Sequence, residues 1–401
     1  MATTIPVTQD TSHPGSRMAA ASLAGEWPVY AVLIASASII IGLIWDISWH
    51  RTIGRDTFWS PPHLMQQGGA IISGLSCGYL ALKTTFRGSP EERARSVSFW
   101  GFRAPLGAWV CIWGTIMMIT SAPFDNWWHN AYGLDVKIVS PPHMVLASGM
   151  IAIQLGAMLM ALGAQNRARS DSDRTHLAIL FSISAAVIVE MVTILITEDA
   201  AFANEMHGSA FYRITGMVLP LFMIAFARSS RLSWPATRIA IIYMLLTMLA
   251  IWILQLVPAT PKLAPIYNAV TTMRPPPFPL LLFVPAIAID LILSRFTRMS
   301  DWVMSIVLGA AFVAAMLAAH WYWAEFMLSP SARNFFFGVD QWDYSSRPGP
   351  WRYQYWNLDT DASGSWNPAG FVKGLGIAIV LAIVSARLGL GWGKGMSRIQ
   401  R

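Results

Sequence analysis

The chain alternates between long apolar stretches and short polar segments. A helix of about 20 apolar residues spans the hydrocarbon core of a bilayer. The pattern therefore predicts an all-α, polytopic membrane protein with about ten transmembrane helices. We expect these helices at residues 28–48, 63–85, 104–123, 143–165, 177–197, 211–229, 238–257, 277–295, 302–325 and 370–391.

The composition of the 401-residue chain agrees with this pattern. Hydrophobic residues make up 55% and charged residues 12%, and the mean hydropathy is +0.47. A soluble enzyme of this size is much less apolar, so that class is excluded. Residues 1–26 lack a continuous apolar core, which favours a disordered cytoplasmic tail over a cleaved signal peptide.

Lys and Arg collect in every second connection between the apolar stretches. Short loops rich in these residues stay in the cytoplasm. We therefore expect a multi-pass protein of the bacterial inner (cytoplasmic) membrane with both termini in the cytoplasm. The formal charge of +7 is explained by this topology and by contact with anionic lipid, and not by nucleic-acid binding. The residues concerned are Arg87, Arg93, Arg95, Arg167, Arg169, Arg174, Arg228, Arg231, Arg238, Arg295, Arg298, Lys394, Arg398 and Arg401.

Two segments of the chain are near copies of each other. The first runs from Asp46 to His63 and the second from Asp125 to His143. Both contain Asp, Trp and His, then Gly and Asp, and both close on Ser-Pro-Pro-His. The offset of 79 residues between the two aspartates and the cytoplasmic connection predict parallel repeats of a helical hairpin, with both motifs on the outer membrane face.

Each copy contains the side chains of a three-ligand metal site. Asp46 and His50 are four residues apart, so they share one face of a helix. The prolines before His63 suit the first turn of the next helix and fix where that histidine starts. Two imidazoles and a carboxylate then converge and leave room for water, oxygen or substrate. The second copy repeats this pattern with Asp125, His129 and His143.

Other interpretations of these residues remain. A single histidine inside a membrane often serves as a hydrogen-bonded link between helices, and an Asp–His pair can be a plain salt bridge. The retention of Asp, His and His in both copies favours metal binding. Asp56 and Asp135 could orient a ligand histidine or cap the loop.

The segment WDISWHRTIGRDTFWSPPH resembles the metal-binding stretch of the C subunit of the particulate methane and ammonia monooxygenases. That family carries an Asp, a Trp-His four positions on, an Arg-Asp-Thr and a Pro-x-His. Asp46, His50 and His63 fall on this pattern.

The family continues with a second ligand set of Asn, His and His. Here Asp125, His129 and His143 have matching spacing, and the aspartate stands where the family has asparagine. The resemblance covers roughly residues 28–165, and the helices that follow have no counterpart in it.

This resemblance implies a copper-dependent membrane monooxygenase, or a subunit of one, with Asp125, His129 and His143 as candidate catalytic residues. It also implies an electron donor, partner subunits, an oligomer, and a small apolar or ammonia-like substrate. Zinc and iron accept similar ligands. The alternatives are a copper transport or loading protein and a haem-binding or non-catalytic subunit of a membrane complex.

The chain divides into five segments on these grounds. The disordered tail (1–26) precedes the helical domain with the duplicated motif (27–165). A second helical half (166–328) and an extramembrane loop rich in aromatic residues (329–369) follow. The loop could cap the metal sites, meet a partner or form a surface lid. The last helix and a cytoplasmic tail (370–401) end the chain.

The second half offers weaker candidates for chemistry. Additional ligands could come from Glu198, Asp199, Glu205 and His207, or from His320 and Glu325, although an aromatic belt also explains the surroundings of His320. Glu190 and Asp290 lie in apolar helices, where a carboxylate either handles protons or forms a buried hydrogen bond; for both we favour the hydrogen bond. Cys77 and Cys111 lie inside helices, and we expect no disulfide between them.

Overall fold

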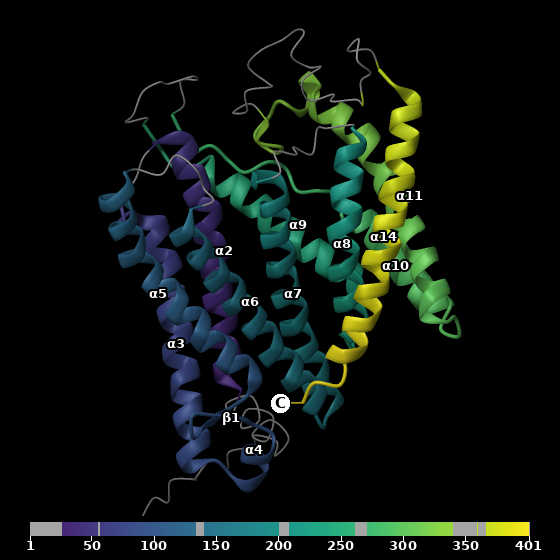
Figure 1. The fold of residues 1–401 in the computed structure, drawn as a ribbon. Helices are drawn as coiled ribbons and strands as arrows, with labels where there is room; N and C mark the ends of the chain where they lie inside the picture. Colours follow the sequence, from purple (N-terminus) through teal and green to yellow (C-terminus); the bar gives the residue numbers. More distant parts are fainter. Residues whose placement is uncertain are drawn as a thin grey trace, which may run out of the picture.

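The computed structural model describes residues 26–54, 57–133, 140–199, 208–260, 271–339, 359 and 366–400. These residues form an all-helical bundle (Figure 1). Its α-helices are α2 (Trp27–Thr52), α3 (Pro61–Arg87), α4 (Pro90–Ala94), α5 (Leu106–Tyr132), α6 (Pro141–Arg167), α7 (Asp171–Asp199), α8 (Ser209–Ser229), α9 (Pro235–Leu254), α10 (Phe283–Arg295), α11 (Asp301–Met327) and α14 (Pro368–Met396). A two-stranded antiparallel sheet, β1 (Val97–Phe99) and β2 (Phe102–Ala104), precedes α5, and a 3-10 turn, η1 (Pro330–Ala332), follows α11.

Eight helices of the described residues are long and apolar enough to cross a membrane: α2, α5, α6, α7, α8, α9, α11 and α14. The protein is thus a multi-pass membrane protein by helix length and composition. The expected number was about ten. The two expected spans outside this set are α3, which has 27 residues but begins with a less apolar PPHLMQQGG sequence, and α10, which has only 13 residues.

The helix expected at residues 277–295 begins six residues late. Prolines at 275, 276, 277 and 279 remove backbone N–H donors and keep the preceding segment out of a helix. This segment is instead attached to two helices. Ser48 Oγ on α2 donates to the Arg274 carbonyl oxygen at 2.6 Å, and Leu280 N donates to Tyr243 Oη on α9 at 2.9 Å.

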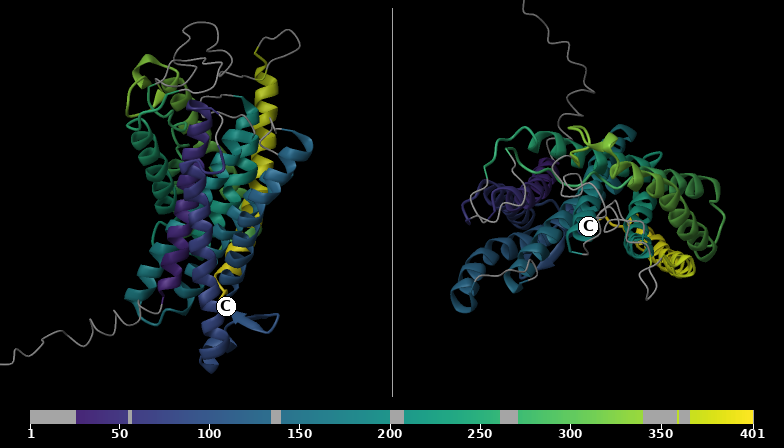
Figure 2. Two further views of the ribbon diagram at one scale, coloured as in Figure 1. Left: turned by 90° about the vertical axis from the view of Figure 1, so that its left-hand side faces the viewer. Right: turned by 90° about the horizontal axis from the view of Figure 1, so that it is seen from above.

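The helices form two groups that are joined through α7 and α9 (Figure 2). In the first group, α2 packs along α3 and α5 packs along α6. In the second, α8 and α11 both pack along α14, and α10 packs against α11. The C-terminal ends of α2 and α5 lie at the same end of the molecule, opposite to α4 and the small sheet (Figure 1). The two expected helical hairpins therefore exist and run in parallel.

The two hairpins share a close helix contact at equivalent positions. A Cβ atom added at Gly69 would lie 2.8 Å from the Ala35 carbonyl oxygen on α2. A Cβ atom added at Gly149 would lie 2.8 Å from the Gly114 carbonyl oxygen on α5. Ala35 and Gly114 differ by the same 79 residues that separate Asp46 from Asp125. The duplication thus extends from the motif into the packing of the helices, where small residues allow close approach.

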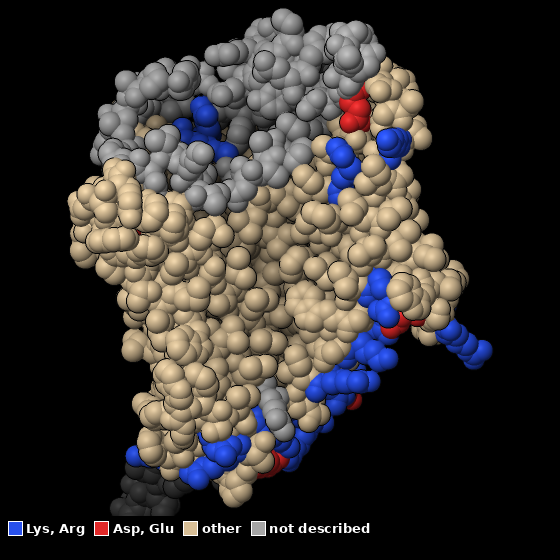
Figure 3. Space-filling view, viewed as in Figure 1, with Lys and Arg blue, Asp and Glu red and all other residues tan. Residues whose placement is uncertain are grey.

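Lys and Arg side chains gather along the lower edge of the molecule, and a broad middle zone of this face is free of them (Figure 3). Helices α3, α6, α8 and α10 each have an arginine in their last turn: Arg87, Arg167, Arg228 and Arg295. The duplicated motif lies at the opposite end of the bundle (Figure 1). That the basic end faces the cytoplasm stays a prediction from the positive-inside rule.

Asp290 forms a buried hydrogen-bonded cap. Its Oδ1 accepts a hydrogen bond from Ala236 N at 3.0 Å, and its Oδ2 accepts from Thr237 N at 2.8 Å and from Thr237 Oγ1 at 2.7 Å. The carboxylate on α10 therefore satisfies backbone donors at the start of α9. Of the two roles considered for Asp290, proton handling and a buried hydrogen bond, the contacts agree with the buried hydrogen bond.

Asp290→Ala is expected to lower the free energy of unfolding by about 1–3 kcal/mol, because it leaves buried N–H donors of α9 without an acceptor. Thermal unfolding in lipid nanodiscs measures the loss. Asp171→Ala is the control, because that carboxylate is 97% exposed, and its ion pair with Arg174 contributes at most about 1 kcal/mol. An equal effect of both substitutions would contradict the capping role.

Candidate metal centre

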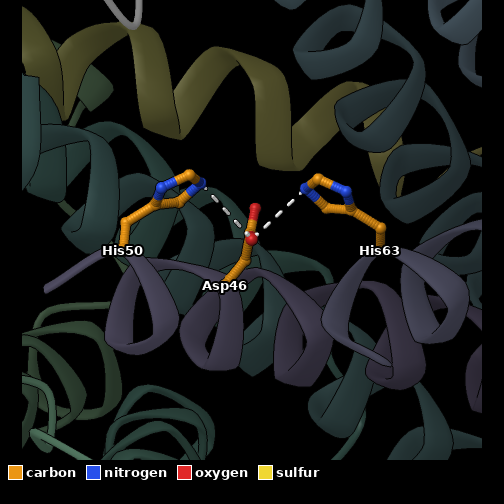
Figure 4. A group of neighbouring side chains, drawn as sticks. All are labelled: Asp46, His50 and His63. Carbon is orange, nitrogen blue, oxygen red and sulfur yellow. Dashed lines mark ion pairs between the residues drawn. The ribbon is translucent and has the colours of Figure 1, made fainter. Parts of the chain in front are cut away.

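The first copy of the motif brings its three expected ligands together. Asp46 and His50 lie one turn apart near the end of α2, and His63 lies in the first turn of α3. Asp46 Oδ1 lies 3.7 Å from His50 Nε2 and 3.3 Å from His63 Nε2. The carboxylate stands between the two rings, and both contacts end on the same oxygen (Figure 4). One ligand atom from each residue lies within 4.8 Å of the other two.

Local sequence explains this convergence. Ser60 has an extended backbone, and Pro61 and Pro62 occupy the first positions of α3. Proline fits there because those N–H groups have no partner within the helix. His63 therefore follows directly at the helix start, next to the end of α2. The turn between the two helices also contains Gly54 with a φ of 99°, a left-handed conformation that favours glycine.

The shared oxygen is buried and lacks a hydrogen bond. Asp46 Oδ1 is closed to solvent and accepts no hydrogen bond from a described residue. The other oxygen, Oδ2, accepts a long hydrogen bond of 3.4 Å from Gln66 Nε2. A buried carboxylate oxygen without a donor is costly. A proton on either imidazole nitrogen or a bound cation would satisfy Oδ1.

The two separations are longer than most hydrogen bonds. N–H···O bonds in proteins span about 2.7–3.2 Å, and two atoms that each lie about 2.0–2.1 Å from a tetrahedral ion are about 3.3–3.4 Å apart. The 3.3 Å separation of Asp46 and His63 lies between these two ranges, and the 3.7 Å separation of Asp46 and His50 exceeds both.

The ring of His63 is oriented by a backbone contact. His63 Nδ1 lies 3.1 Å from the Thr57 carbonyl oxygen. A carbonyl can only accept, so this contact places a proton on Nδ1, and Nε2 faces Asp46 either with a second proton or with a lone pair. Two acceptors that face each other repel unless a proton or a metal ion lies between them. Carbonyl contacts of this kind orient histidine ligands in metal sites.

The second copy has the same plan with a wider arrangement. His129 Nε2 lies 3.3 Å from Asp125 Oδ2, and His143 Nε2 lies 3.8 Å from Asp125 Oδ1. Oδ1 is again buried and accepts no hydrogen bond from the described residues. His129 Nδ1 lies 3.3 Å from the Gly133 carbonyl oxygen, and Ser140 Oγ lies 3.0 Å from His143 Nδ1. The two imidazoles approach different oxygens of Asp125, whereas both imidazoles of the first copy approach the same oxygen of Asp46.

Two sequence differences separate the copies. Pro123 lies inside α5 two residues before Asp125, where it interrupts the helical hydrogen bonds; Ile44 occupies this position in the first copy. Gln66, which donates to Asp46, is replaced by Leu146. The second aspartate therefore sits in a more strongly interrupted helix and lacks the amide donor.

Gln66 and Gly42 are site residues that the sequence analysis missed. A Cβ atom at Gly42 would lie 2.7 Å from Gln66 Cγ, so the glycine provides the space in which Gln66 reaches Asp46. A glutamine one turn after His63 on an otherwise small and apolar helix was the available signal. The role of Gly42 depends on its contact with α3, which the sequence alone does not show.

The other residues considered as ligands or proton carriers lie away from the two motifs or outside the described residues. His320 is 2% exposed and stacks on Phe211 with ring centroids 3.9 Å apart, which is a core position on α11. Glu190 is buried and accepts a hydrogen bond of 2.7 Å from Thr247 Oγ1. Cys77 and Cys111 are buried and free. The side chains of Arg55, Asp56, Asp135, Glu198, Asp199, Glu205 and His207, and most of the 329–369 loop, lie outside the described residues.

No protein-family model, curated protein or solved structure matches the chain. The fold and the site define the class on their own: a multi-pass helical membrane protein with a candidate Asp/His/His metal centre at one end of the bundle. The resemblance to the copper membrane monooxygenases rests on the motif residues alone.

Proposed function

We propose that this protein is a membrane metalloprotein whose two Asp/His/His motifs bind copper on the outer membrane face, and that it works as a copper-dependent monooxygenase or as a subunit of one. The observation that carries the proposal is the buried Oδ1 of Asp46, which two imidazole nitrogens approach at 3.3 Å and 3.7 Å without a hydrogen bond. A bound cation removes the cost of burying this oxygen.

Copper is the proposed metal because two imidazoles and one carboxylate suit it and because the motif resembles a copper-binding stretch. Zinc and iron take similar donors. Bound copper would supply the one-electron and oxygen chemistry that a monooxygenase needs. The residues of the chain position it: the carbonyl oxygens of Thr57 and Gly133 orient His63 and His129, and Gln66 orients Asp46.

The exposure of the ligands leaves one side of each centre accessible. The side chain of His50 is 51% exposed and that of His143 is 40% exposed, whereas Asp46 is 16% exposed. In the first motif the carboxylate thus forms the base of the site and the imidazoles its rim. A small apolar or ammonia-like substrate and oxygen would reach the metal from this rim. Electrons would come from quinol or a partner protein, and partner subunits would complete an oligomer.

The same exposure supports a second function, the transfer or loading of copper. Exposed imidazoles can pass a metal to another protein, and both motifs lie at one end of the bundle. A transport path through the membrane would instead place ligands at several depths. Metal that exchanges readily with a soluble chelator, together with the absence of substrate oxidation, would favour loading over catalysis.

Metal content tests the proposal directly. Protein purified in lipid nanodiscs without chelators is expected to hold copper, with an electron paramagnetic resonance signal that shows nitrogen coordination. The double variant His63→Ala, His143→Ala should lose both the copper and the signal. The matched control is His176→Ala, because His176 lies in the second turn of α7 at the other end of the bundle, where its Nε2 hydrogen bonds with Tyr30 Oη. Metal-free protein that cannot be reconstituted would overturn the proposal.

A further inference from the structure

A cavity of about 40 Å³ lies between α2, α7, α9 and the proline-rich segment before α10. A water molecule needs roughly 10–15 Å³ measured in this way, so the cavity has room for about three. Its α2 wall consists of Ile44, Ile47, Ser48 and Arg51. These residues lie on a different face of α2 from Asp46 and His50, because each residue turns the helix by about 100°. The cavity is therefore separate from the candidate metal centre.

Glu190 is the acidic residue in the wall of this cavity. It is 2% exposed and lies seven residues before Thr197, the last residue of the membrane-spanning part of α7. Thr247 Oγ1 donates to Oε2 at 2.7 Å. Glu190 forms no ion pair with any described residue. A single neutral donor does not offset the cost of an ionised carboxylate at this depth.

Three hydroxyl groups beside Glu190 do not donate to its carboxyl group, because each donates to a backbone carbonyl. Thr193 Oγ1 donates to the Glu190 carbonyl oxygen at 2.9 Å, Thr197 Oγ1 to the Thr193 carbonyl oxygen at 2.9 Å, and Ser48 Oγ to the Arg274 carbonyl oxygen at 2.6 Å. The prolines of the opposite wall have no N–H group. Thr247 Oγ1 therefore remains the hydrogen-bond donor to the Glu190 carboxyl group among the described residues.

Two other ionisable groups of the described residues face the cavity. Arg51 comes from α2, forms no ion pair with Glu190, and leaves the carboxyl without a counter-charge. Tyr243 comes from α9, where its Oη accepts a hydrogen bond from Leu280 N. The proline-rich segment contributes no charged side chain to the wall.

We propose that Glu190 and the water in this cavity form a proton-exchange site inside the helix bundle. The step is balanced: the Glu190 carboxylate and a hydronium ion give the carboxylic acid and water, and release is the reverse. In the acid form, the carboxyl group can donate a hydrogen bond to the water and needs no counter-charge. The site would hold or deliver protons within a few residues of the outer end of α7. This inference does not depend on copper binding.

Infrared difference spectroscopy on the full chain in lipid nanodiscs tests the proposal. The protein is taken through a pH titration in water and then in D₂O. We expect a carbonyl-stretch band of a buried carboxylic acid that shifts in D₂O and titrates reversibly. The band should be lost completely in Glu190→Gln and should survive in Asp290→Asn. A band that survives in Glu190→Gln, or that does not respond to D₂O, would overturn the proposal.

A second variant covers the case in which Glu190→Gln does not fold. Thr247→Val removes the hydroxyl that donates to Glu190, so it should move the position of the same band without abolishing it. No shift in this variant would contradict the assignment. A Na⁺ titration at constant pH shows whether the site binds a proton or a metal cation. If Na⁺ removes the acid band and pH does not, the site holds a metal cation and the proton-exchange proposal is wrong.

Discussion

Asp46→Asn is expected to lower the metal affinity of the first motif by more than about 100-fold, because changes outside the ligand set alone cost 10–100-fold. Oδ1 of Asp46 is approached by both imidazoles of this motif, at 3.7 Å from His50 and 3.3 Å from His63. Asparagine keeps the shape of the side chain and removes its charge. The amide oxygen is a weaker ligand, and the amide N–H₂ cannot bind a cation. Isothermal titration with copper measures the change.

The matched variant is Asp125→Asn in the second motif. If the proposed relationship to the copper membrane monooxygenases holds, asparagine is the family's residue at that position, so we expect the second motif to keep measurable affinity. Gln66→Leu gives an intermediate case, because it converts the surroundings of Asp46 to those of Asp125, where Leu146 stands. A loss of about 10-fold would agree with its role as an orienting donor. Equal and small effects of all three substitutions would argue against ligation by Asp46.

Gly69→Ala is expected to lower the free energy of unfolding by about 1–3 kcal/mol, the usual cost of overpacking. The new Cβ atom would lie 2.8 Å from the Ala35 carbonyl oxygen and 2.9 Å from Ile39 Cγ1. A backbone oxygen cannot move aside, so α3 must shift away from α2. The displacement also moves His63 relative to Asp46, and we expect weaker metal binding at the first motif only.

Its neighbour provides the control. A Cβ atom at Gly68 would meet no atom within 4 Å. Gly68→Ala should therefore be neutral or raise stability by up to about 1 kcal/mol, because alanine favours the helix. Thermal unfolding and copper titration on the two variants together separate packing from helix propensity. Equal stability of Gly68→Ala and Gly69→Ala would contradict the close contact.

The sequence allowed the main features of the bundle to be predicted because they depend on local patterns. Apolar stretches placed the helices, and the Ser-Pro-Pro-His segments marked where α3 and α6 begin. The convergence of Asp46, His50 and His63 was expected from helical spacing and the short connection between α2 and α3, and the structure places one ligand atom of each within 4.8 Å of the others. That this group binds copper stays a prediction.

Other features depend on contacts between distant parts of the chain. The segment expected to be a helix at 277–295 is helical only from Phe283, because the prolines before it keep the chain out of a helix. The hydropathy pattern predicted an earlier start because the segment is apolar. The role of Gly42 beside Gln66 and the cap that Asp290 forms on α9 require helices in contact. The second motif also has Pro123 inside α5 and Leu146 in place of Gln66, and the spacing of Asp125, His129 and His143 does not show the effect of either residue.

Each ligand set is contained in a single hairpin, with two residues on the first helix and one on the second. A segment of this kind carries a complete site when its gene is copied, because no residue has to be supplied by the rest of the protein. The two copies can then diverge independently under selection. Asp46 and Asp125 already differ in their neighbours: Gln66 donates to Asp46, and Leu146 stands at the equivalent position beside Asp125.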